Sequence, residues 1–529
     1  MRRLVQLLLV ATLAACKPTA APPPVTSPSP APGKLDIVEL AATDAQKKLA
    51  SGEITSHSLT QAYLDRIASI DKIGPSLNSV IELNPDALKQ ADALDAERRA
   101  GKVRGPLHGI PILLKDNIDA VGMANSAGSL ALADNHPQHD AFIVARLRAA
   151  GAVILGKTNL SEWANFRSTR SISGWSSRGG QTRNAYVLDR NPCGSSAGTG
   201  TAIAASLAAI GVGTETDGSI ICPASVNGLV GMKPTVGLLS RNGIIPISIS
   251  QDTAGPMGRS VADVALLLNA LAGVDEADPS GHAAAGNIPE DYRSFLKPDA
   301  LKGKRFGVLR QTMGFHPDVD AAVEKAIVAL KAAGAQVLDV KLKTYGAWDK
   351  PELEVLLYEF KDGLNAYLKN SGSGQASLEA LIGWNKANAG KAMPLFDQEL
   401  FEQAQAKGPL TDKAYLKAKS DARRLAGKDG LLAALDTNNL DAVIAPSMAP
   451  AWPTDPVLGD HFLGAGYGVA AVAGTPSITV PMGEVHGLPI GLAFLGRAYS
   501  EPELIGYAFA YEQLTHARKA PQYKQTLTP

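Results

Sequence analysis

The spacing of apolar residues along this chain changes repeatedly between two patterns, one typical of amphipathic helices and one typical of buried strands. Helical spacing predicts helices within 35–71, 84–100, 140–150, 260–271 and 502–516. Short continuous apolar runs predict strands at 110–114, 152–155, 443–446, 474–481 and 488–494. The first stretch divides into two helices at a turn after Ser51, where Thr55 or Ser56 can cap the second helix. Helices that alternate with buried strands indicate one α/β domain.

The stretch from Asn191 to Pro223 is rich in small and hydroxyl residues and contains two Gly-Ser turns, Gly194–Ser195 and Gly218–Ser219. Glycine lets the backbone adopt unusual angles and approach a ligand closely, and a hydroxyl held at such a turn is a candidate nucleophile. Between the turns, the alanine-rich segment 199–209 can form a tightly packed helix that holds both in place. The alternative is a buried helix between two ordinary turns.

Composition and charge restrict the class of protein. Of the 529 residues, 45% are hydrophobic and 19% are charged, as in a soluble globular protein, and the formal net charge is zero. A neutral chain lacks the electrostatic footprint of a nucleic-acid-binding protein. The three cysteines cannot form a disulfide scaffold, no Cys/His cluster has zinc-finger spacing, and no apolar run of about 20 residues predicts a membrane span. We therefore expect no metal, no other cofactor and no nucleic-acid partner.

The first residues have the features of an export signal. Arg2 and Arg3 precede an apolar stretch that is too short to span a bilayer, and small residues lead into Cys16. This pattern predicts a lipoprotein-type signal peptide over 1–15, with a lipid anchor at Cys16 as the only membrane contact. The Pro- and Ala-rich segment 16–34 is predicted to be an extended tether. The expected location is the periplasm or the outer membrane of a bacterium, and the alternative is an ordinary secretory signal with an incidental cysteine.

Lys115 lies at the end of the predicted strand 110–114. Charged residues are seldom buried without partners, so a lysine in this place is unusual. The side chain either extends its amine to the surface or is a desolvated lysine that acts as a base.

Two further motifs match known patterns without the structural context that these patterns need. Residues 151–158 fit the phosphate-loop pattern, but their four variable positions favour a strand, and the turn predicted at 156–159 starts no helix. Residues 194–198 fit the nucleophile elbow of α/β-hydrolases, with Ser196 as the nucleophile. That site also needs a histidine, and neither His486 nor His516 lies in a suitable loop.

Lys115 and the two Gly-Ser turns together resemble the amidase signature family. The resemblance extends roughly over 35–516 and includes the 24-residue spacing of Ser195 and Ser219. Further family landmarks are 156–159, 252–256 and 487–491. The resemblance implies an α/β fold, in which a single large domain has a mixed, mostly parallel twisted β-sheet flanked by α-helices. It places the catalytic domain at 35–529, with 275–436 as a variable region that shapes substrate binding.

By the same resemblance, Ser219 is the nucleophile, Ser195 the bridging serine and Lys115 the base of a Ser-Ser-Lys triad. A serine hydroxyl becomes an effective nucleophile when a base takes its proton, and a lysine can be that base only when it is neutral. Lowering a lysine pKa from about 10.4 to 7 takes about 4.6 kcal/mol, a shift that burial can supply. The family holds the bridging serine through a cis peptide bond, which here would be Gly194–Ser195.

The resemblance also assigns the oxyanion hole to the backbone N–H groups of Thr216, Asp217 and Gly218, together with that of Ser219. It implies an amidase that hydrolyses a carboxamide C–N bond through an acyl-enzyme on Ser219. The implied substrate is a small-molecule or peptide amide.

The two turns depart from the commonest family pattern at Cys193, Asp217 and Ile221, and none of these changes removes a catalytic group. Together with Cys222 and Pro223 they resemble the bacterial peptide amidase branch, which removes the C-terminal amide from peptides. An oxidising compartment would allow a disulfide between Cys193 and Cys222. We expect two buried free thiols instead.

Three other interpretations are compatible with parts of the sequence. One is the amidotransferase subunit of the same family that modifies aminoacyl-tRNA, against which the export signal and the neutral charge argue. Another is a lipid-anchored binding protein with an inactive site, against which the intact Lys115, Ser195 and Ser219 argue. The third is an esterase that acts through Ser196. No feature of the sequence indicates an oligomeric state.

Overall fold

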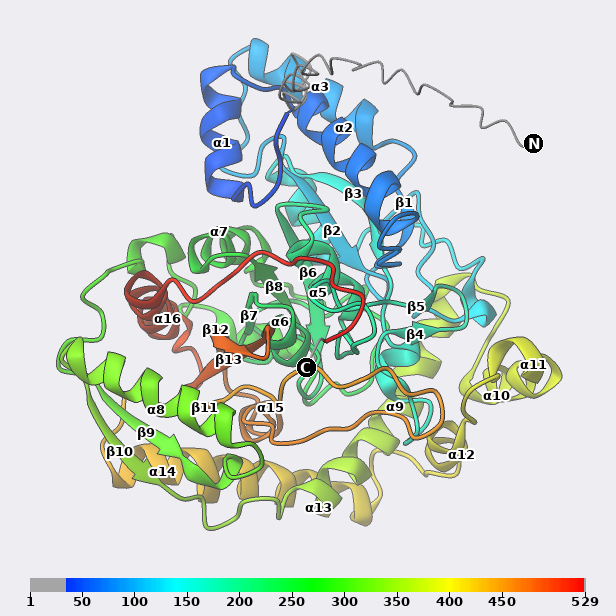
Figure 1. Ribbon diagram of the computed structural model, residues 1–529. Coiled ribbons are helices and arrows are strands. Elements are labelled where there is room, and N and C mark those ends of the chain that lie inside the picture. Colours follow the sequence, from blue (N-terminus) through cyan, green and yellow to red (C-terminus); the bar gives the residue numbers. More distant parts are fainter. Residues whose placement is uncertain (1–34, 528–529) are drawn as a thin grey trace, which may run out of the picture. The chain divides into compact units, whose positions relative to one another are not determined.

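The computed structural model describes residues 35–527, which fold around one 11-stranded β-sheet (Figure 1). The signal peptide and tether predicted over 1–34 lie outside the described residues. Within the described part of the chain, no helix is both long and apolar enough to cross a membrane. A separate small hairpin pairs β4 (Trp175–Ser176) with β5 (Gly180–Gln181).

The strands of the large sheet follow the order β1-β3-β2-β6-β8-β7-β12-β13-β11-β9-β10. In chain order they are β1 (Val80–Leu83), β2 (Pro111–Lys115), β3 (Val153–Thr158), β6 (Ile210–Glu215), β7 (Val230–Lys233), β8 (Thr253–Gly258), β9 (Arg305–Leu309), β10 (Gln336–Val340), β11 (Ala442–Pro446), β12 (Ser477–Val485) and β13 (Leu488–Leu495). Each predicted strand is present.

The sheet is mixed, as expected, but the expectation that parallel pairs predominate is wrong. Strands β3-β2-β6 and β11-β9-β10 pair in parallel, whereas the other six neighbouring pairs are antiparallel. One of these antiparallel pairs follows from the short connection at His486–Gly487, which can join β12 to β13 only as a hairpin. Parallel neighbours need a long crossover, and the helices that supply such crossovers lie toward the two ends of the sheet.

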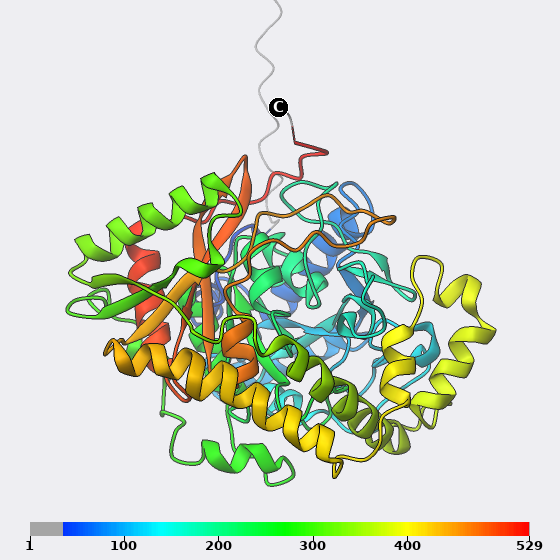
Figure 2. The same cartoon turned by 90° about the horizontal axis from the view of Figure 1, so that it is seen from below.

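Helices pack against both faces of the sheet. They are α1 (Ala42–Ser51), α2 (Ser56–Arg66), α3 (Ala87–Arg99), α4 (Phe142–Ala149), α5 (Ala197–Ala204), α6 (Ile221–Val226), α7 (Val261–Leu271), α8 (Pro317–Ala332), α9 (Asp349–Ser371), α10 (Leu378–Ala387), α11 (Ala389–Ala392), α12 (Glu399–Gln405), α13 (Lys413–Arg423), α14 (Leu432–Thr437), α15 (Gly468–Ala473) and α16 (Glu501–Thr515). Successive side chains of β13 point to opposite faces of the sheet. Ala493 and Leu495 pack with α14 and α15, whereas Phe494 packs on Tyr507 of α16. Figure 2 shows the α13–α14 stretch and α8 on opposite sides of the strands at this end of the sheet.

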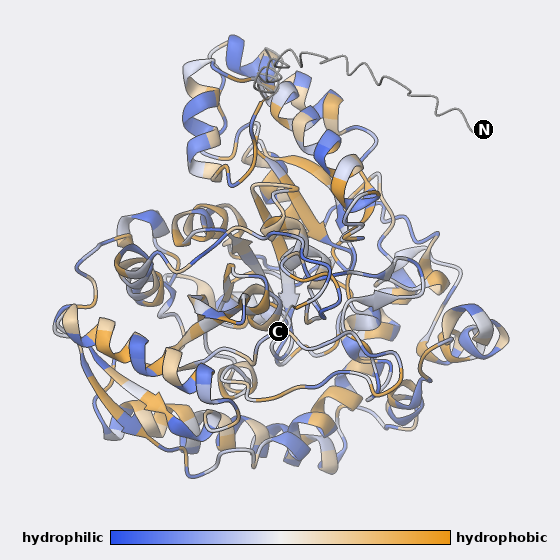
Figure 3. Ribbon diagram, in the orientation of Figure 1, coloured by the Kyte–Doolittle hydropathy of each residue, from blue (hydrophilic) through white to orange (hydrophobic). Residues whose placement is uncertain are grey.

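The sequence patterns that predicted the helices have the expected physical basis. The Thr55 side chain caps α2 in a capping box, and the Ser260 hydroxyl accepts a hydrogen bond from the Asp263 N–H at the start of α7. The turn predicted at 156–159 is wrong, because β3 continues through Thr158. In Figure 3, β2 and β3 are largely hydrophobic, whereas α1 and α3 carry many hydrophilic residues, as expected of strands that are covered by helices.

Two adjacent parallel strands bring the chemical groups together. Strands β2 and β6 pair directly, so Lys115 at the end of β2 and the chain that follows β6 lie at the same edge of the sheet. Helix α5 is wholly buried against this edge. A side chain at Gly198 would overlap the backbone of Asn159, so the close approach of α5 to the chain after β3 requires glycine.

Candidate active site

The Lys115 amine is buried at the carboxyl end of β2 and is surrounded by uncharged oxygen atoms. Its Nζ atom lies 2.7 Å from Ser195 Oγ, 2.9 Å from Thr214 Oγ1 and 3.1 Å from the Thr214 carbonyl oxygen. Burial lowers the pKa of Lys115 to about 7, and the charges of Glu215 and Asp252 oppose that shift. A large fraction of this amine is therefore neutral at physiological pH.

Ser195 joins this lysine to the loop before α5. The Gly194–Ser195 peptide bond is cis, as the family resemblance implied. The Ser195 side chain is buried, and its carbonyl oxygen accepts a hydrogen bond from the Ser161 N–H at 3.1 Å. The hydroxyl of Ser195 thus has a fixed position beside the amine.

Ser219 lies in the turn between β6 and α6, next to the Ser195 loop. Its carbonyl oxygen accepts a hydrogen bond from the Ser196 N–H at 3.1 Å, which ties the two turns together. The residue is 8% exposed, whereas Lys115 and Ser195 are fully buried. No acceptor or donor among residues 35–527 is hydrogen-bonded to the Ser219 hydroxyl. Ser219 is thus the most exposed residue of the three.

The backbone between β6 and α6 presents unused donors. The N–H groups of residues 216–219 make no hydrogen bond to any acceptor in the described part of the chain. Immediately afterwards, the Glu215 carboxylate accepts hydrogen bonds from the N–H groups of Ile220 (2.7 Å) and Ile221 (3.0 Å), which fixes the turn. Preorganised free N–H groups of this kind can stabilise an oxyanion.

Gly218 occupies the tightest point of this turn. Its φ is +79°, in the left-handed region, and a Cβ at this position would overlap the ring of Tyr467. Both conditions require glycine. The Tyr467 ring therefore packs directly on the turn that carries Ser219.

The two cysteines of the turns form a disulfide, contrary to the expectation of free thiols. Cys193 precedes the Ser195 loop and Cys222 follows Ser219, and their Cα atoms are 6.0 Å apart. The bond is possible because the Ser196–Ser219 hydrogen bond already brings the two turns side by side. Sequence alone could not show this distance, because 29 positions separate the two cysteines.

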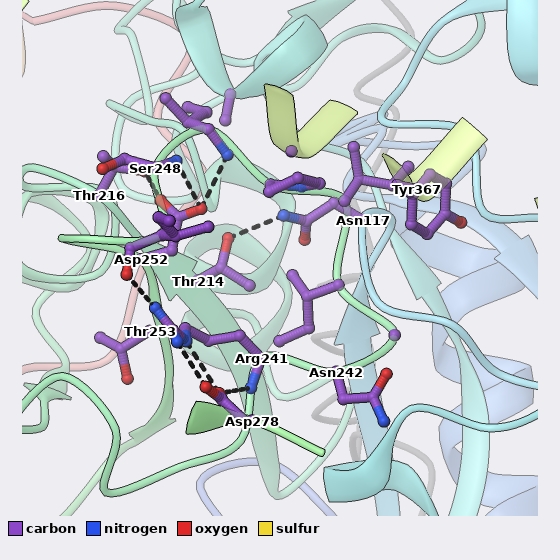
Figure 4. Close-up of a pocket in the computed structure, with 18 of the residues that line it drawn as sticks. Asn117, Thr214, Thr216, Arg241, Asn242, Ser248, Asp252, Thr253, Asp278 and Tyr367 are labelled. Atoms are coloured by element: carbon purple, nitrogen blue, oxygen red, sulfur yellow. Dashed lines mark hydrogen bonds and ion pairs between the residues drawn. The ribbon is translucent and has the colours of Figure 1, made fainter. Parts of the chain in front are cut away.

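A cavity of about 360 Å³ opens beside the Ser195 hydroxyl (Figure 4). Ser195 and Thr216 line it, whereas Lys115, Asp217, Gly218 and Ser219 are not part of its lining. One wall is apolar and comes from 244–249 and from the α9 residues Gly363, Ala366 and Tyr367. The polar part of the lining includes Asn117, Thr214, Glu215, Arg241, Asp252 and Asp278. A cavity of this size and polarity suits a small organic group.

The Asp252 carboxylate lies in the lining of this cavity and accepts three hydrogen bonds. Its oxygen atoms accept hydrogen bonds from Thr216 Oγ1 at 2.5 Å and from the N–H groups of Ile247 (2.7 Å) and Ser248 (2.8 Å), as Figure 4 shows. Burial raises the pKa of Asp252 to about 6, and hydrogen bonds together with Arg241 oppose the shift. Asp252 thus links the turn between β6 and α6, through Thr216, to the apolar wall of the cavity.

Asp217 contributes a carboxyl group next to Glu352 of α9. Each carboxyl group affects the pKa of the other, and Gln251 Nε2 donates to Glu352 Oε1 at 2.8 Å. Burial raises the pKa of Asp217 well above its ordinary value and that of Glu352 to about 7. Both shifts favour the protonated form of these carboxyl groups over the charged form.

The structure supports neither the phosphate-loop pattern at 151–158 nor the nucleophile elbow with Ser196 as a functional site. Ser196 is buried, and its hydroxyl donates to the Thr214 carbonyl oxygen at 3.0 Å. The imidazole of His486 lies on the surface beside Asp318. Lys157 of the phosphate-loop pattern is buried in the strand, where it lies 3.2 Å from Asp116 and donates to the Ile118 carbonyl oxygen. Ser196 and Lys157 thus make buried contacts within the fold.

Sequence reasoning missed six residues that shape the site: Asn117, Thr214, Glu215, Asp252, Tyr467 and Glu352. The sequence does point to Thr214, Glu215 and Asp252. Thr214 and Glu215 immediately precede the Ser219 turn, and Asp252 is the first residue of the family landmark 252–256. No signal existed for Tyr467 or Glu352, which reach the site only through tertiary packing. Within 35–527, no group of three or more His, Cys, Asp or Glu side chains could hold a metal ion.

Comparisons with known proteins agree with this arrangement. The family profile described as Amidase matches residues 58–505. A protein described as a probable amidase from Arabidopsis thaliana is 40% identical over 500 residues, which cover 92% of each chain. The X-ray structure of native peptide amidase from Stenotrophomonas maltophilia is 54% identical, with a TM-score of 0.88 over 92% of this chain and 99% of that one. A peptide amidase in complex with the competitive inhibitor chymostatin is 55% identical, with a TM-score of 0.89 over 92% and 99% of the two chains.

Proposed function

The chain belongs to the amidase family and hydrolyses amide C–N bonds, and from this premise we propose that it removes the C-terminal amide of peptides through an acyl-enzyme on Ser219. The observation that carries the proposal is the 2.7 Å contact between the Lys115 amine and the Ser195 hydroxyl in a buried site. A buried amine with a pKa of about 7 can accept a proton near neutral pH.

The proton follows a path through two hydroxyl groups. Ser219 Oγ attacks the amide carbon while its proton passes to Ser195 Oγ, and the Ser195 proton passes to Lys115 Nζ. The tetrahedral intermediate forms a negatively charged oxygen, which the free N–H groups of residues 216–219 stabilise. The C–N bond then breaks as the leaving nitrogen takes the proton back from Lys115 through Ser195.

The second half of the reaction returns the enzyme to its starting state. The first half leaves an ester between the acyl group and Ser219, together with ammonia from a primary amide. A water molecule attacks this ester, gives its proton to the Ser195–Lys115 pair and releases a carboxylic acid. Ser219 recovers its hydrogen, and Lys115 is again neutral.

Two observations support a peptide amide as the substrate. Native peptide amidase from Stenotrophomonas maltophilia and this chain are 54% identical over 92% of its length. The cavity beside Ser195 has an apolar wall from 244–249 and α9, which suits an amino-acid side chain. Helix α9 lies within 275–436, so this contribution also supports the proposal that the region shapes substrate binding.

Two experiments test this proposal. A serine-reactive fluorophosphonate probe, followed by peptide mapping, should modify Ser219 and leave an S219A variant unlabelled. Modification of Ser196 would instead support the esterase interpretation, and an unlabelled wild type would support an inactive binding protein. Ammonia release from peptide amides, compared with simple carboxamides and peptide anilides, should be fastest for the peptide amides.

We also propose that the chain is exported and anchored through Cys16, on the basis of the residues before it. The Cys193–Cys222 disulfide supports an oxidising compartment. Expression of the full chain in a bacterium with radiolabelled palmitate should label the wild type and leave a C16A variant unlabelled. An unlabelled wild type that is secreted as a soluble protein would contradict the lipid anchor.

A further inference from the structure

Asn117 has an unused acceptor atom in the lining of the cavity. The residue follows Lys115 by two positions and is 5% exposed. Its Nδ2 atom donates to Thr214 Oγ1 at 3.0 Å, as Figure 4 shows, and its Oδ1 atom is buried without a hydrogen-bond donor in the described part of the chain. A buried acceptor without a partner is costly, so it indicates a missing donor.

The other buried polar groups of the lining are accounted for within the protein. The hydroxyl groups of Tyr367 and Ser248 donate to Asp119 and Glu359, and Asp252 accepts three hydrogen bonds. Glu215 also has one unpartnered oxygen atom, but its other oxygen already accepts hydrogen bonds from two backbone N–H groups. Asn117 is neutral and has no such compensation.

Asn117 is also close to the reacting groups. Its Nδ2 atom and Lys115 Nζ both bond to the same hydroxyl, Thr214 Oγ1, and Lys115 in turn contacts Ser195. A substrate whose carbonyl carbon lies at the Ser195–Ser219 hydroxyl groups has its neighbouring atoms within reach of this part of the cavity. In a peptide amide, the backbone N–H of the amidated residue is two bonds from that carbon.

We propose that the side-chain oxygen of Asn117 accepts a hydrogen bond from the backbone N–H of the amidated residue, so that the site selects α-acylamino amides over plain carboxamides. A neutral amide oxygen is matched to a neutral N–H group, and the apolar wall formed by Ile244, Ile245 and Ile247 takes the side chain of the same residue. A site built to bond an N–H group discriminates strongly against an analogue that lacks it, because the buried acceptor is then left unpaired. This inference rests on the proposed deamidation of peptides.

The test compares two substrates that differ in one atom. N-acetylphenylalaninamide has the N–H group, and 2-acetoxy-3-phenylpropanamide has an ester oxygen in its place. The measured quantity is kcat/KM for ammonia release by the full chain. The wild type should prefer the N–H substrate by roughly 10- to 100-fold. Asn117→Ala should lower this preference to less than roughly threefold, even if both rates fall.

Two further variants separate recognition from a general defect. Asn385 of α10 is a matched control, because it is also buried with an unpartnered Oδ1 atom but lies outside the cavity lining. Asn385→Ala should keep the preference of the wild type. Asn117→Asp keeps an acceptor oxygen and should retain a preference of at least roughly tenfold, which keeps the test decisive if Asn117→Ala is inactive.

The outcomes distinguish this inference from the proposed function. Equal kcat/KM values of the wild type for the two substrates would overturn the role of Asn117 and leave peptide deamidation intact. A preference that survives Asn117→Ala would assign recognition of the N–H group to another residue. Failure of the wild type to release ammonia from either compound, or from longer peptide amides, would overturn the proposed function itself.

Discussion

Lys115 and Ser195 lie 80 positions apart in the chain, yet their Nζ and Oγ atoms are 2.7 Å apart in a buried site. No carboxylate within 35–527 lies within ion-pair distance of this amine. Its hydrogen-bonding contacts are to hydroxyl and carbonyl oxygen atoms, none of which carries a full negative charge. The pair is thus arranged to move a proton and not to hold a charge.

The first prediction concerns pH. Because Lys115 must be neutral to act as the base and its pKa is about 7, kcat/KM for an uncharged amide should rise with pH through about 7 and then level off. Below that pH the amine is protonated, and the rate should fall about tenfold for each pH unit. A pH–rate profile from pH 5 to 9 measures this. A rate that stays constant down to pH 5 would contradict a lysine base.

The second prediction concerns removal of the amine. Lys115→Met should lower kcat near neutral pH by about 10²- to 10⁴-fold, the usual contribution of a general base, with little loss of thermal stability, because a buried amine is replaced by an apolar group. Lys157→Met is the matched control, since Lys157 is equally buried but pairs with Asp116. That variant should lose stability in thermal unfolding and should keep the wild-type pH profile. A wild-type kcat in Lys115→Met would contradict the proposed mechanism.

The third prediction concerns Asp252, whose negative charge raises the pKa of Lys115. Asp252→Asn removes that charge, so the pKa of Lys115 should fall and the acidic limb of the pH–rate profile should move to lower pH. Thr216→Val removes only the 2.5 Å hydrogen bond to Asp252. Because that hydrogen bond lowers the pKa of Asp252, its loss favours the neutral carboxyl and should move the acidic limb in the same direction, by less than Asp252→Asn does. A shift of the limb to higher pH in Asp252→Asn would show that the carboxylate acts in another way.

The fourth prediction concerns the turn that carries Ser219. Gly218→Ala places a Cβ against the ring of Tyr467 at a φ of +79°, so the N–H groups of the turn should move out of position. Loss of an oxyanion donor lowers kcat by about 10²- to 10³-fold. Gly383→Ala in α10 has open space around it and should behave as the wild type in activity and unfolding assays. Normal kcat in Gly218→Ala would argue against these N–H groups as the oxyanion hole.

The fifth prediction concerns the Cys193–Cys222 disulfide. It closes a loop of 29 residues, which in the chain-entropy description stabilises the fold by about 3 to 4 kcal/mol. Reduction, or the double variant Cys193→Ala/Cys222→Ala, should lower the free energy of unfolding by that order in denaturant titrations. A reductant should change the wild type and leave the double variant unchanged. Equal stability of oxidised and reduced wild type would show that packing alone holds the turns.

Local patterns in the sequence predicted much of the fold because the forces behind them are local. The Thr55 cap, the Ser260 cap and the apolar run that ends at Lys115 involve residues a few positions apart. Strand direction was harder to predict, because it depends on which strands become neighbours in the sheet. The antiparallel centre and the continuation of β3 through Thr158 therefore differ from expectation.

By itself, the sequence determined the candidate chemistry: a lysine after a buried strand, two Gly-Ser turns with fixed spacing, and a resemblance that names their roles. Only the tertiary structure decided the pKa values, the disulfide pairing and the hydrogen-bonding state of these groups. The lowered pKa of Lys115, the bond between Cys193 and Cys222, the raised pKa of Asp217 and the unpartnered oxygen of Asn117 all depend on burial and on contacts between distant parts of the chain. Such properties follow from the local dielectric and from distances of a few ångströms, and no spacing along the chain fixes either.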